Sequence, residues 1–183
     1  MAFWSTVDQK DPKRNFRFIV SFDGLQGQEG SVWWAKKVGK PNFSVAESKH
    51  SYLNHTFYWP GRVEWQPITM TLVDPIEPAS TATLNTLMET IGYSPPNGPG
   101  GDGLVTQSKQ KSDAALGPIT IQQIDSNGDA LETWTLHAPF IKKITYGELD
   151  YENDDLTQIE VELRYDWAAC EIGGTTAFTT ETQ

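Results

Sequence analysis

The sequence predicts a mainly β protein, an antiparallel β-sandwich or split barrel with one flanking α-helix. Three observations support this prediction. Apolar and polar residues alternate in about seven short segments, which is the pattern of strands that bury one face. Helical spacing of apolar residues occurs in a single segment. The turns between the alternating segments are short, so neighbouring strands are expected to run antiparallel.

The length and composition predict one globular domain with extensions. The chain has 183 residues, of which 38% are hydrophobic and 21% are charged. We expect an N-terminal arm over residues 1–13, a β domain over 14–172 with a flexible insert at about 94–115, and a loose tail over 173–183. No apolar run approaches the roughly 18 residues of a membrane-spanning helix. No signal-peptide pattern begins the chain, so we expect neither membrane insertion nor secretion.

The charge and the cysteine content exclude several classes of function. The net charge is −10, which argues against general nucleic-acid binding because such binding depends on neutralising phosphates. A single cysteine, Cys170, excludes an intramolecular disulfide and a thiolate metal cluster, so its expected role is packing. Seven tryptophans are many for this length, and large aromatic residues supply buried area in cores and interfaces.

The first part of the chain is predicted to contain strands at Phe16–Phe22, Val32–Val38 and Asn42–Ala46. The next segment, Ser48–Gly61, holds two histidines, four aromatic residues and few charges. We expect it to be a long hairpin tip or a connection. A surface segment this apolar usually covers either its own core or a neighbouring molecule.

A further strand is predicted at Arg62–Asp74. Its apolar residues change sides near Pro67, which indicates a bulge or a bend there. Apolar residues spaced by three and four positions then predict one helix at Ala79–Ile91, with Gly92 placed to end it. This helix has one apolar face, so we expect it to lie on a sheet.

The segment Ser94–Gly103 is rich in glycine and proline and is expected to be the most flexible stretch. The polar stretch that follows, up to Ala115, fits either a short helix or a mobile segment. Two more strands are predicted at Ile119–Ile124 and Leu131–Ile141. Asp125–Gly128 between them predicts a hairpin turn, because Asn-Gly accepts the positive φ angles that such a turn needs.

The clearest alternation lies in the last predicted strand. Its apolar side consists of Ile159, Val161, Leu163, Tyr165 and Trp167. Its other side consists of Glu160, Glu162, Arg164 and Asp166. The chain from Glu148 to Asp166 holds eight carboxylates and one base. We expect the apolar side to be buried, whereas alternation alone does not decide what the acidic side faces.

No pattern in the sequence selects catalytic or metal-binding residues. His50 and His55 lie near Glu47, but their spacing matches no known ligand pattern and His137 is remote. The calcium-loop interpretation of residues 125–136 fails because glycine is missing at the sixth place and glutamate at the twelfth. The glycine-rich segment lacks the Lys-Ser/Thr step of a phosphate loop. We therefore expect no catalytic residues, no metal and no cofactor, and a protein that is not an enzyme.

Two adjacent pairs of lysines, with one more lysine close to the first pair, stand out in this acidic chain. They are Lys36, Lys37, Lys40, Lys142 and Lys143. Two interpretations stay open at this point: partners for acidic neighbours at an interface, or ordinary solubilising charge.

Three segments together resemble the tail tube protein of contractile-tailed bacteriophages. Residues 12–16 look like that family's short arm before a first strand. Trp59–Pro75 looks like its central strand, where a Gly-Arg step and a tryptophan precede an alternating run that ends at an acidic residue; a helix follows. Leu149–Trp167 looks like its ending, where an acidic turn leads into an alternating strand. The order and spacing of these segments hold over residues 14–167.

The resemblance implies a ring-forming tail-tube fold and a structural role. Hexameric rings would close by joining sheets edge to edge and would stack into a hollow tube inside a contractile sheath. The implied partners are further copies of this chain, the sheath protein, baseplate and tail terminator proteins, and a tape measure protein in the lumen before ejection. The implied location is the virion, after assembly in the host cytoplasm. Related tubes serve type VI secretion and extracellular contractile injection systems.

The resemblance also suggests a role for the acidic residues. A lumen lined with carboxylates would repel phosphates, so DNA could pass through without specific binding. The lumen-facing candidates are Glu160 and Glu162, which we prefer, with Asp150 and Glu152. The candidates for contacts between subunits or rings are Phe3, Trp4, His50, Tyr52, Leu53, His55, Phe57, Tyr58 and Trp59.

Other functions fit parts of the sequence. The same fold could form the tube of a non-phage contractile injection system, or a tube initiator or baseplate hub, although the short chain argues against a hub. A carbohydrate-binding β-sandwich would stack sugar rings on exposed tryptophans such as Trp33, Trp34 or Trp59. Such a module should be monomeric, whereas a tube subunit should assemble.

Overall fold

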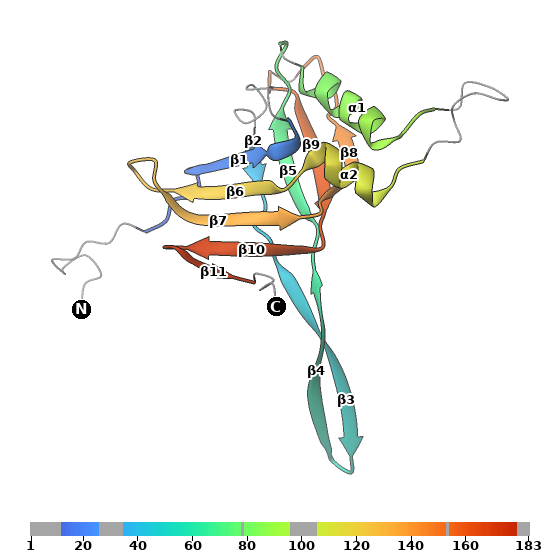
Figure 1. The fold of residues 1–183 in the computed structure, drawn as a ribbon, viewed down its shortest axis with the longest axis vertical. Helices are drawn as coiled ribbons and strands as arrows, with labels where there is room; N and C mark the ends of the chain where they lie inside the picture. Colours follow the sequence, from blue (N-terminus) through green and yellow to red (C-terminus); the bar gives the residue numbers. More distant parts are fainter. Residues whose placement is uncertain (1–11, 26–34, 78, 96–105, 153, 179–183) are drawn as a thin grey trace.

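The computed structural model describes residues 12–25, 35–77, 79–95, 106–152 and 154–178. These residues form a five-stranded sheet, a four-stranded sheet and a long two-stranded hairpin, with helices beside the four-stranded sheet (Figure 1). All strand pairs are antiparallel. The predicted fold class, a mainly β protein of packed antiparallel sheets, is confirmed.

The five-stranded sheet has the strand order β1 (Phe18–Phe22), β6 (Ile119–Ile124), β7 (Ala130–His137), β10 (Trp167–Ile172) and β11 (Thr175–Ala177). The four-stranded sheet has the order β2 (Ala35–Val38), β5 (Ile68–Val73), β9 (Gln158–Arg164) and β8 (Phe140–Tyr146). The hairpin consists of β3 (Phe43–Tyr52) and β4 (His55–Trp65). A single 3-10 turn, η1 (Asp23–Leu25), ends β1.

The core lies between the two larger sheets, where every second residue of each strand points inward. Val20, Ile121 and Leu136 come from the five-stranded sheet, and Met70 and Val161 come from the four-stranded sheet. The apolar side predicted for the last strand is buried from Ile159 through Tyr165, as expected.

Two α-helices lie side by side next to β8: the one predicted from helical spacing, and a short one in the polar stretch for which a short helix was one of the two alternatives. The predicted one, α1 (Ser80–Ile91), buries its apolar face and ends at Gly92, whose φ is 107°. The second, α2 (Lys109–Leu116), begins at Ser108, whose hydroxyl accepts a hydrogen bond from the Lys111 N–H. Leu116 of α2 packs with Leu87 and Ile91 of α1. The polar sequence of α2 has no helical spacing of apolar residues. The sequence features that could have located this helix are its capping residues, Ser108 and Gly117.

Two predicted strands are wrong at one point each, because the chain changes sheets there. Leu131–Ile141 breaks at Ala138, whose φ is 50°, so that β7 and β8 belong to different sheets. The last predicted strand breaks after Arg164, so that Trp167 begins β10 in the other sheet. The two corners touch: the Asp166 N–H donates to the His137 carbonyl over 3.1 Å, and the His137 and Trp167 rings stack at 4.7 Å.

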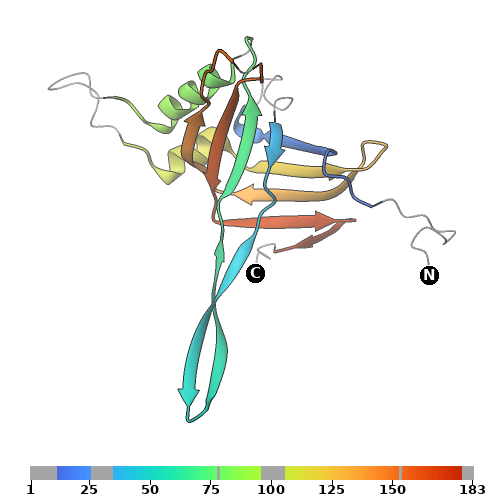
Figure 2. The same cartoon turned by 180° about the vertical axis from the view of Figure 1, so that it is seen from behind.

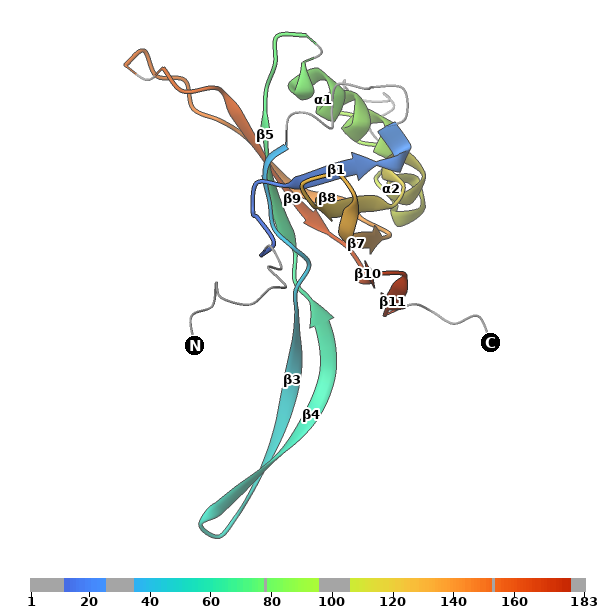
Figure 3. The same ribbon diagram turned by 90° about the vertical axis from the view of Figure 1, so that its left-hand side faces the viewer.

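Two extensions project from opposite ends of the sheets. The hairpin leaves one end (Figures 1 and 2), and the β8–β9 loop, described at residues 147–152 and 154–157, leaves the other (Figure 3). Within the segment predicted as a loose tail, β11 pairs with β10 through a Gly173-Gly174 turn at positive φ. Of the predicted flexible insert, residues 96–105 lie outside the described residues, as do Phe3, Trp4, Trp33 and Trp34.

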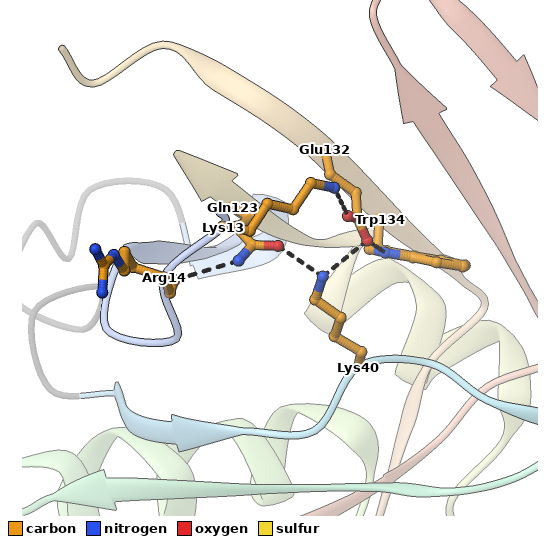
Figure 4. A network of polar contacts seen from close by, with 6 residues as sticks. All are labelled: Lys13, Arg14, Lys40, Gln123, Glu132 and Trp134. Atoms are coloured by element: carbon orange, nitrogen blue, oxygen red, sulfur yellow. Dashed lines mark hydrogen bonds and ion pairs between the residues drawn. The ribbon is translucent and has the colours of Figure 1, made fainter. Parts of the chain in front are cut away.

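A buried carboxylate joins three separate parts of the chain (Figure 4). Glu132 on β7 accepts hydrogen bonds from Lys13, which precedes β1, from Lys40, which precedes the hairpin, and from the indole of Trp134. Lys40 also donates to Gln123 on β6 over 2.7 Å. Burial raises the pKa of Glu132, but the hydrogen bonds from Lys13, Lys40 and Trp134 outweigh it and bring the pKa to about 2.

This ion-pair cluster predicts a specific pH dependence of stability. Because the folded-state pKa of Glu132 lies below its usual 4.5, its contribution is complete above about pH 4.5 and is lost as the pH falls towards 2. We expect Glu132→Gln to lower the free energy of unfolding at pH 7 by about 1–2 kcal/mol, and the difference from wild type to vanish near pH 2. Urea unfolding measured between pH 7 and pH 2 tests this.

Glu171→Gln is the matched control, because Glu171 lies on the same sheet but is exposed. We expect that variant to change the free energy of unfolding by no more than about 0.5 kcal/mol. Equal stability of wild type and Glu132→Gln at pH 7 would contradict the role assigned to the cluster.

Candidate assembly surface

The hairpin is an extension of the four-stranded sheet. β2 leads into β3, and β4 leads into β5 after a break at Gln66–Pro67, where the change of sides predicted a bend. With strands of ten and eleven residues, the hairpin is about 35 Å long. Its turn is formed by Leu53 and Asn54, with Leu53 at a φ of 51°. The segment predicted as a hairpin tip or connection is thus mostly paired strand.

Strand pairing divides the outer half of the hairpin into two sides, because directly opposed residues share a side. One, the aromatic side, consists of His50, Tyr52, His55, Phe57 and Trp59, together with Ser48. Its ring centroids lie 4.7 Å apart for His55–Phe57, 6.2 Å for Phe57–Trp59 and 6.3 Å for His50–Trp59. The other, the polar side, consists of Glu47, Lys49, Ser51, Thr56, Tyr58 and Pro60.

A β-bulge separates this outer half from the base of the hairpin. The register shifts between Val45 and Glu47, where β4 has one residue more than β3. A Cβ on Gly61 would lie 2.9 Å from the Ala46 carbonyl oxygen, so the close approach of the strands requires glycine there. At the base, Phe43 and Trp65 pack edge to face at 5.1 Å. These base residues are on the same side of the ribbon as the outer polar side.

The outer half of the hairpin is exposed on both sides. Trp59 is 49% exposed, Phe57 47% and Tyr52 65%, and Leu53 at the turn is 86% exposed. A two-stranded hairpin is at best marginally stable alone in water, and a contiguous exposed apolar surface usually marks an interaction site. The structure therefore brings seven of the predicted contact residues together on one projection; Phe3 and Trp4 lie outside the described residues.

The predicted lumen residues occupy two different places. Glu160 and Glu162 lie together on the outer face of the four-stranded sheet, where Glu160 is exposed and Glu162 is half-buried. Asp150 and Glu152 lie in the β8–β9 loop, beyond the end of the sheet. The structure thus groups the two preferred candidates and separates the other two from them.

The outer face of the four-stranded sheet carries mixed charge. Lys143 lies directly opposite Glu162, and the Lys142 ammonium donates to Glu162 over 2.6 Å. Lys37 on β2 lies opposite Thr71, which in turn lies opposite Glu160. The acidic pattern of β9 is therefore flanked by lysines from other strands.

Each of the two lysine pairs noted in the sequence lies in an edge strand of the four-stranded sheet, at a register shift. Lys36–Lys37 and Lys142–Lys143 each coincide with a register shift, one in β2 and one in β8. These strands are the two edges of the four-stranded sheet. Lysines and bulges at a sheet edge limit uncontrolled pairing with other chains, so both open edges of this sheet carry the same protection.

The carboxylates and histidines of the described ranges do not gather into a metal site. No group of three or more His, Cys, Asp or Glu side chains there is placed to hold a metal ion. The Asp125 carboxylate accepts hydrogen bonds from the N–H groups of Asn127 and Asp129, at 2.7 and 3.0 Å, which stabilises the predicted turn. These backbone hydrogen bonds also lower the pKa of Asp125. No helix in the described part is long and apolar enough to cross a membrane.

No protein-family model and no curated protein matches the chain. Several solved structures are similar to the chain. A chain in the cryo-EM structure of the anti-feeding prophage baseplate, 6-fold symmetrised, is 15% identical with a TM-score of 0.62, over 88% of this chain and 97% of that one. A chain in the PVC extracellular contractile injection system, sheath–tube complex in the extended state, is 19% identical with a TM-score of 0.60, over 90% and 94%.

The crystal structure of Hcp protein is 14% identical to the chain with a TM-score of 0.52, over 88% of this chain and 97% of that one. At such identities the similarity concerns the fold. Over most of its length, this protein therefore has the fold of chains found in contractile injection systems and of Hcp protein.

Proposed function

We propose that the protein is a structural tube subunit: copies close into hexameric rings, and the rings stack into a hollow tube inside a contractile sheath. The observation that carries this proposal is the hairpin, whose outer half exposes aromatic residues on a projection with no core of its own. Burying one such side chain contributes about 1.5–3 kcal/mol. The shared fold supports the proposal, because the similar chains occur in a baseplate and in a sheath–tube complex.

The four-stranded sheet supports ring closure. Its edge strands β2 and β8 each have one side without a strand partner in the described chain. Neighbouring strands of this sheet alternate in direction, so its two edge strands, β2 and β8, run in opposite directions. β8 of one copy can therefore pair antiparallel with β2 of the next copy. A closed ring then has no open edges, which removes the hazard of exposed strand edges.

In this proposal the outer face of the four-stranded sheet, with Glu160 and Glu162, lines the lumen. The carboxylates keep a phosphate backbone from adhering, and DNA passes without specific binding. The same face carries Lys37, Lys142 and Lys143, so the carboxylates offset these lysines and keep the wall from attracting phosphates. The proposed partners are the sheath protein, baseplate and terminator proteins and a tape measure protein, and the proposed location is the virion after assembly in the host cytoplasm.

A second candidate is the tube of a non-phage contractile injection system. Two observations favour it: the similar structures include the anti-feeding prophage and an extracellular contractile injection system, and a wall of mixed charge suits a protein passenger as well as DNA. Purified particles distinguish the two candidates, because a phage tail joins a DNA-filled head and an injection system carries protein.

Assembly itself is the first test. We expect the purified wild-type protein to form rings or tubes in negative-stain electron microscopy and to sediment as large species. A variant in which residues 46–62 are replaced by Asn-Gly closes a two-residue turn on the opposed pair Val45 and Val63. This variant should fold, because the outer half makes no part of the core, and should not stack.

The outcome against the proposal is equally clear. Monodisperse wild-type particles of 20.5 kDa that bind glycans would favour a carbohydrate-binding module instead. Tubes formed equally well by the shortened variant would show that the hairpin is not the contact.

The position of Glu160 and Glu162 can be tested in assembled tubes. We expect wild-type tubes to retain no single-stranded oligonucleotide at about 0.15 M salt, and the Glu160→Gln/Glu162→Gln tubes to retain it, because removing both carboxylates leaves a basic wall. Retention should fall as salt rises. It is measured by fluorescence of a labelled oligonucleotide that sediments with the tubes.

The control changes the same net charge elsewhere. Glu89→Gln/Glu171→Gln alters α1 and the outer face of the five-stranded sheet, so these tubes should behave as wild type. Equal retention by both double variants would contradict the lumen assignment.

A further inference from the structure

We propose that the hairpin docks onto a second copy through its aromatic side alone, and that His50 and His55 make this contact dependent on pH. The contact forms when both imidazoles are neutral and is released on acidification. This inference rests on the proposed function, since it concerns how one subunit holds the next.

The chemistry of the two sides selects the aromatic one. In the outer half of the hairpin, the aromatic side carries no Asp, Glu, Lys or Arg, whereas the polar side carries Glu47 and Lys49. Burying the polar side would remove two charges from water without partners on the hairpin, which costs far more than it gains. Burying the aromatic side removes apolar rings from water and is favourable.

The two histidines stand within this side and contact its other rings. His55 meets Phe57 edge to face, at 4.7 Å and 79°, and His50 lies 6.3 Å from Trp59. Both histidines are exposed in the single copy, so protonation there leaves the charge in water. When the aromatic side is covered, an imidazolium loses that water and finds no carboxylate on its own side of the outer half; the carboxylate of Glu64 on that side belongs to the base of the hairpin, opposite Ser44. Docking therefore favours the neutral imidazoles.

In the described chain, the ring contacts of the two histidines are with other residues of the hairpin. The outer half of the hairpin projects away from both sheets (Figures 1 and 3), and its ring contacts are all within the hairpin. The charged residues nearest in the pairing, Glu47 and Lys49, face the opposite side. His50 and His55 are thus the basic residues on this side of the outer half.

The expected direction opposes the effect of overall charge. The chain has a net charge of −10 and a pI of about 4.6, so acidification towards pH 5.5 reduces repulsion between copies and should favour association. A contact that excludes both protonated histidines instead weakens on acidification, by up to about tenfold per histidine for each pH unit. Release on acidification is therefore a specific signature of the histidines.

The experiment compares assembly by sedimentation and negative-stain microscopy at pH 7.5, 6.5 and 5.5, at constant ionic strength. Wild type should assemble at pH 7.5 and lose most of its tubes at pH 5.5. His50→Gln/His55→Gln should assemble at pH 5.5 at least as well as at pH 7.5, because only the reduced repulsion between copies then acts. Lys49→Gln, on the opposite side of the hairpin, should respond to pH as wild type does.

A second pair of variants tests the side. Phe57 and Tyr58 are sequence neighbours on opposite sides, both exposed and both outside the core. Phe57→Ser should abolish assembly at pH 7.5, whereas Tyr58→Ser should retain it, with the melting temperature of each unassembled subunit unchanged.

Each remaining outcome is decisive. Wild-type tubes that persist at pH 5.5, or a double-histidine variant that releases as wild type does, would overturn the role of the histidines. Equal loss in Phe57→Ser and Tyr58→Ser would overturn the one-sided contact. Absence of wild-type assembly at every pH would overturn the tube proposal itself together with this inference.

Discussion

A two-stranded ribbon has no interior, and this constraint governs what the protein needs from its surroundings. β3 and β4 pair with each other along one edge each, but neither strand can cover a side of the other. At the base of the hairpin the rest of the chain supplies cover, since Phe43 and Trp65 pack with Phe178. The aromatic side of the outer half lies beyond that reach, and in our proposal a second copy covers it.

The charge on the outer face of the four-stranded sheet also depends on which strands are neighbours in it. β9 alone presents glutamates to the outside, and its sequence neighbourhood is strongly acidic. In the sheet, Lys142 and Lys143 of β8 stand beside Glu162, and Lys37 of β2 lies across β5 from Glu160, although β2 and β8 are more than a hundred residues apart in the sequence. A wall built from this face would therefore adhere weakly to a passenger of either sign, which is useful in a conduit.

Much of the local structure could be predicted from the residues, and the errors share one cause. Alternation located β1, β6 and the apolar side of β9, and spacing with a terminal glycine located α1. The breaks at Ala138 and after Arg164 were missed because a strand that turns a corner into the other sheet can keep its alternation. For the candidate site, composition identified the apolar hairpin segment, but only strand pairing separates His50 and Phe57 from Lys49 and Tyr58.

The sequence by itself determined which residues avoid water and with what period, because these are properties of neighbouring side chains along one strand or helix. Tertiary structure alone decided which strands share a sheet, and therefore that Glu162 meets Lys142 and that Glu132 binds Lys13 and Lys40. It also decided that the hairpin would project without cover. Such pairings depend on contacts between distant segments, whose register is set by the whole core and not by any local pattern.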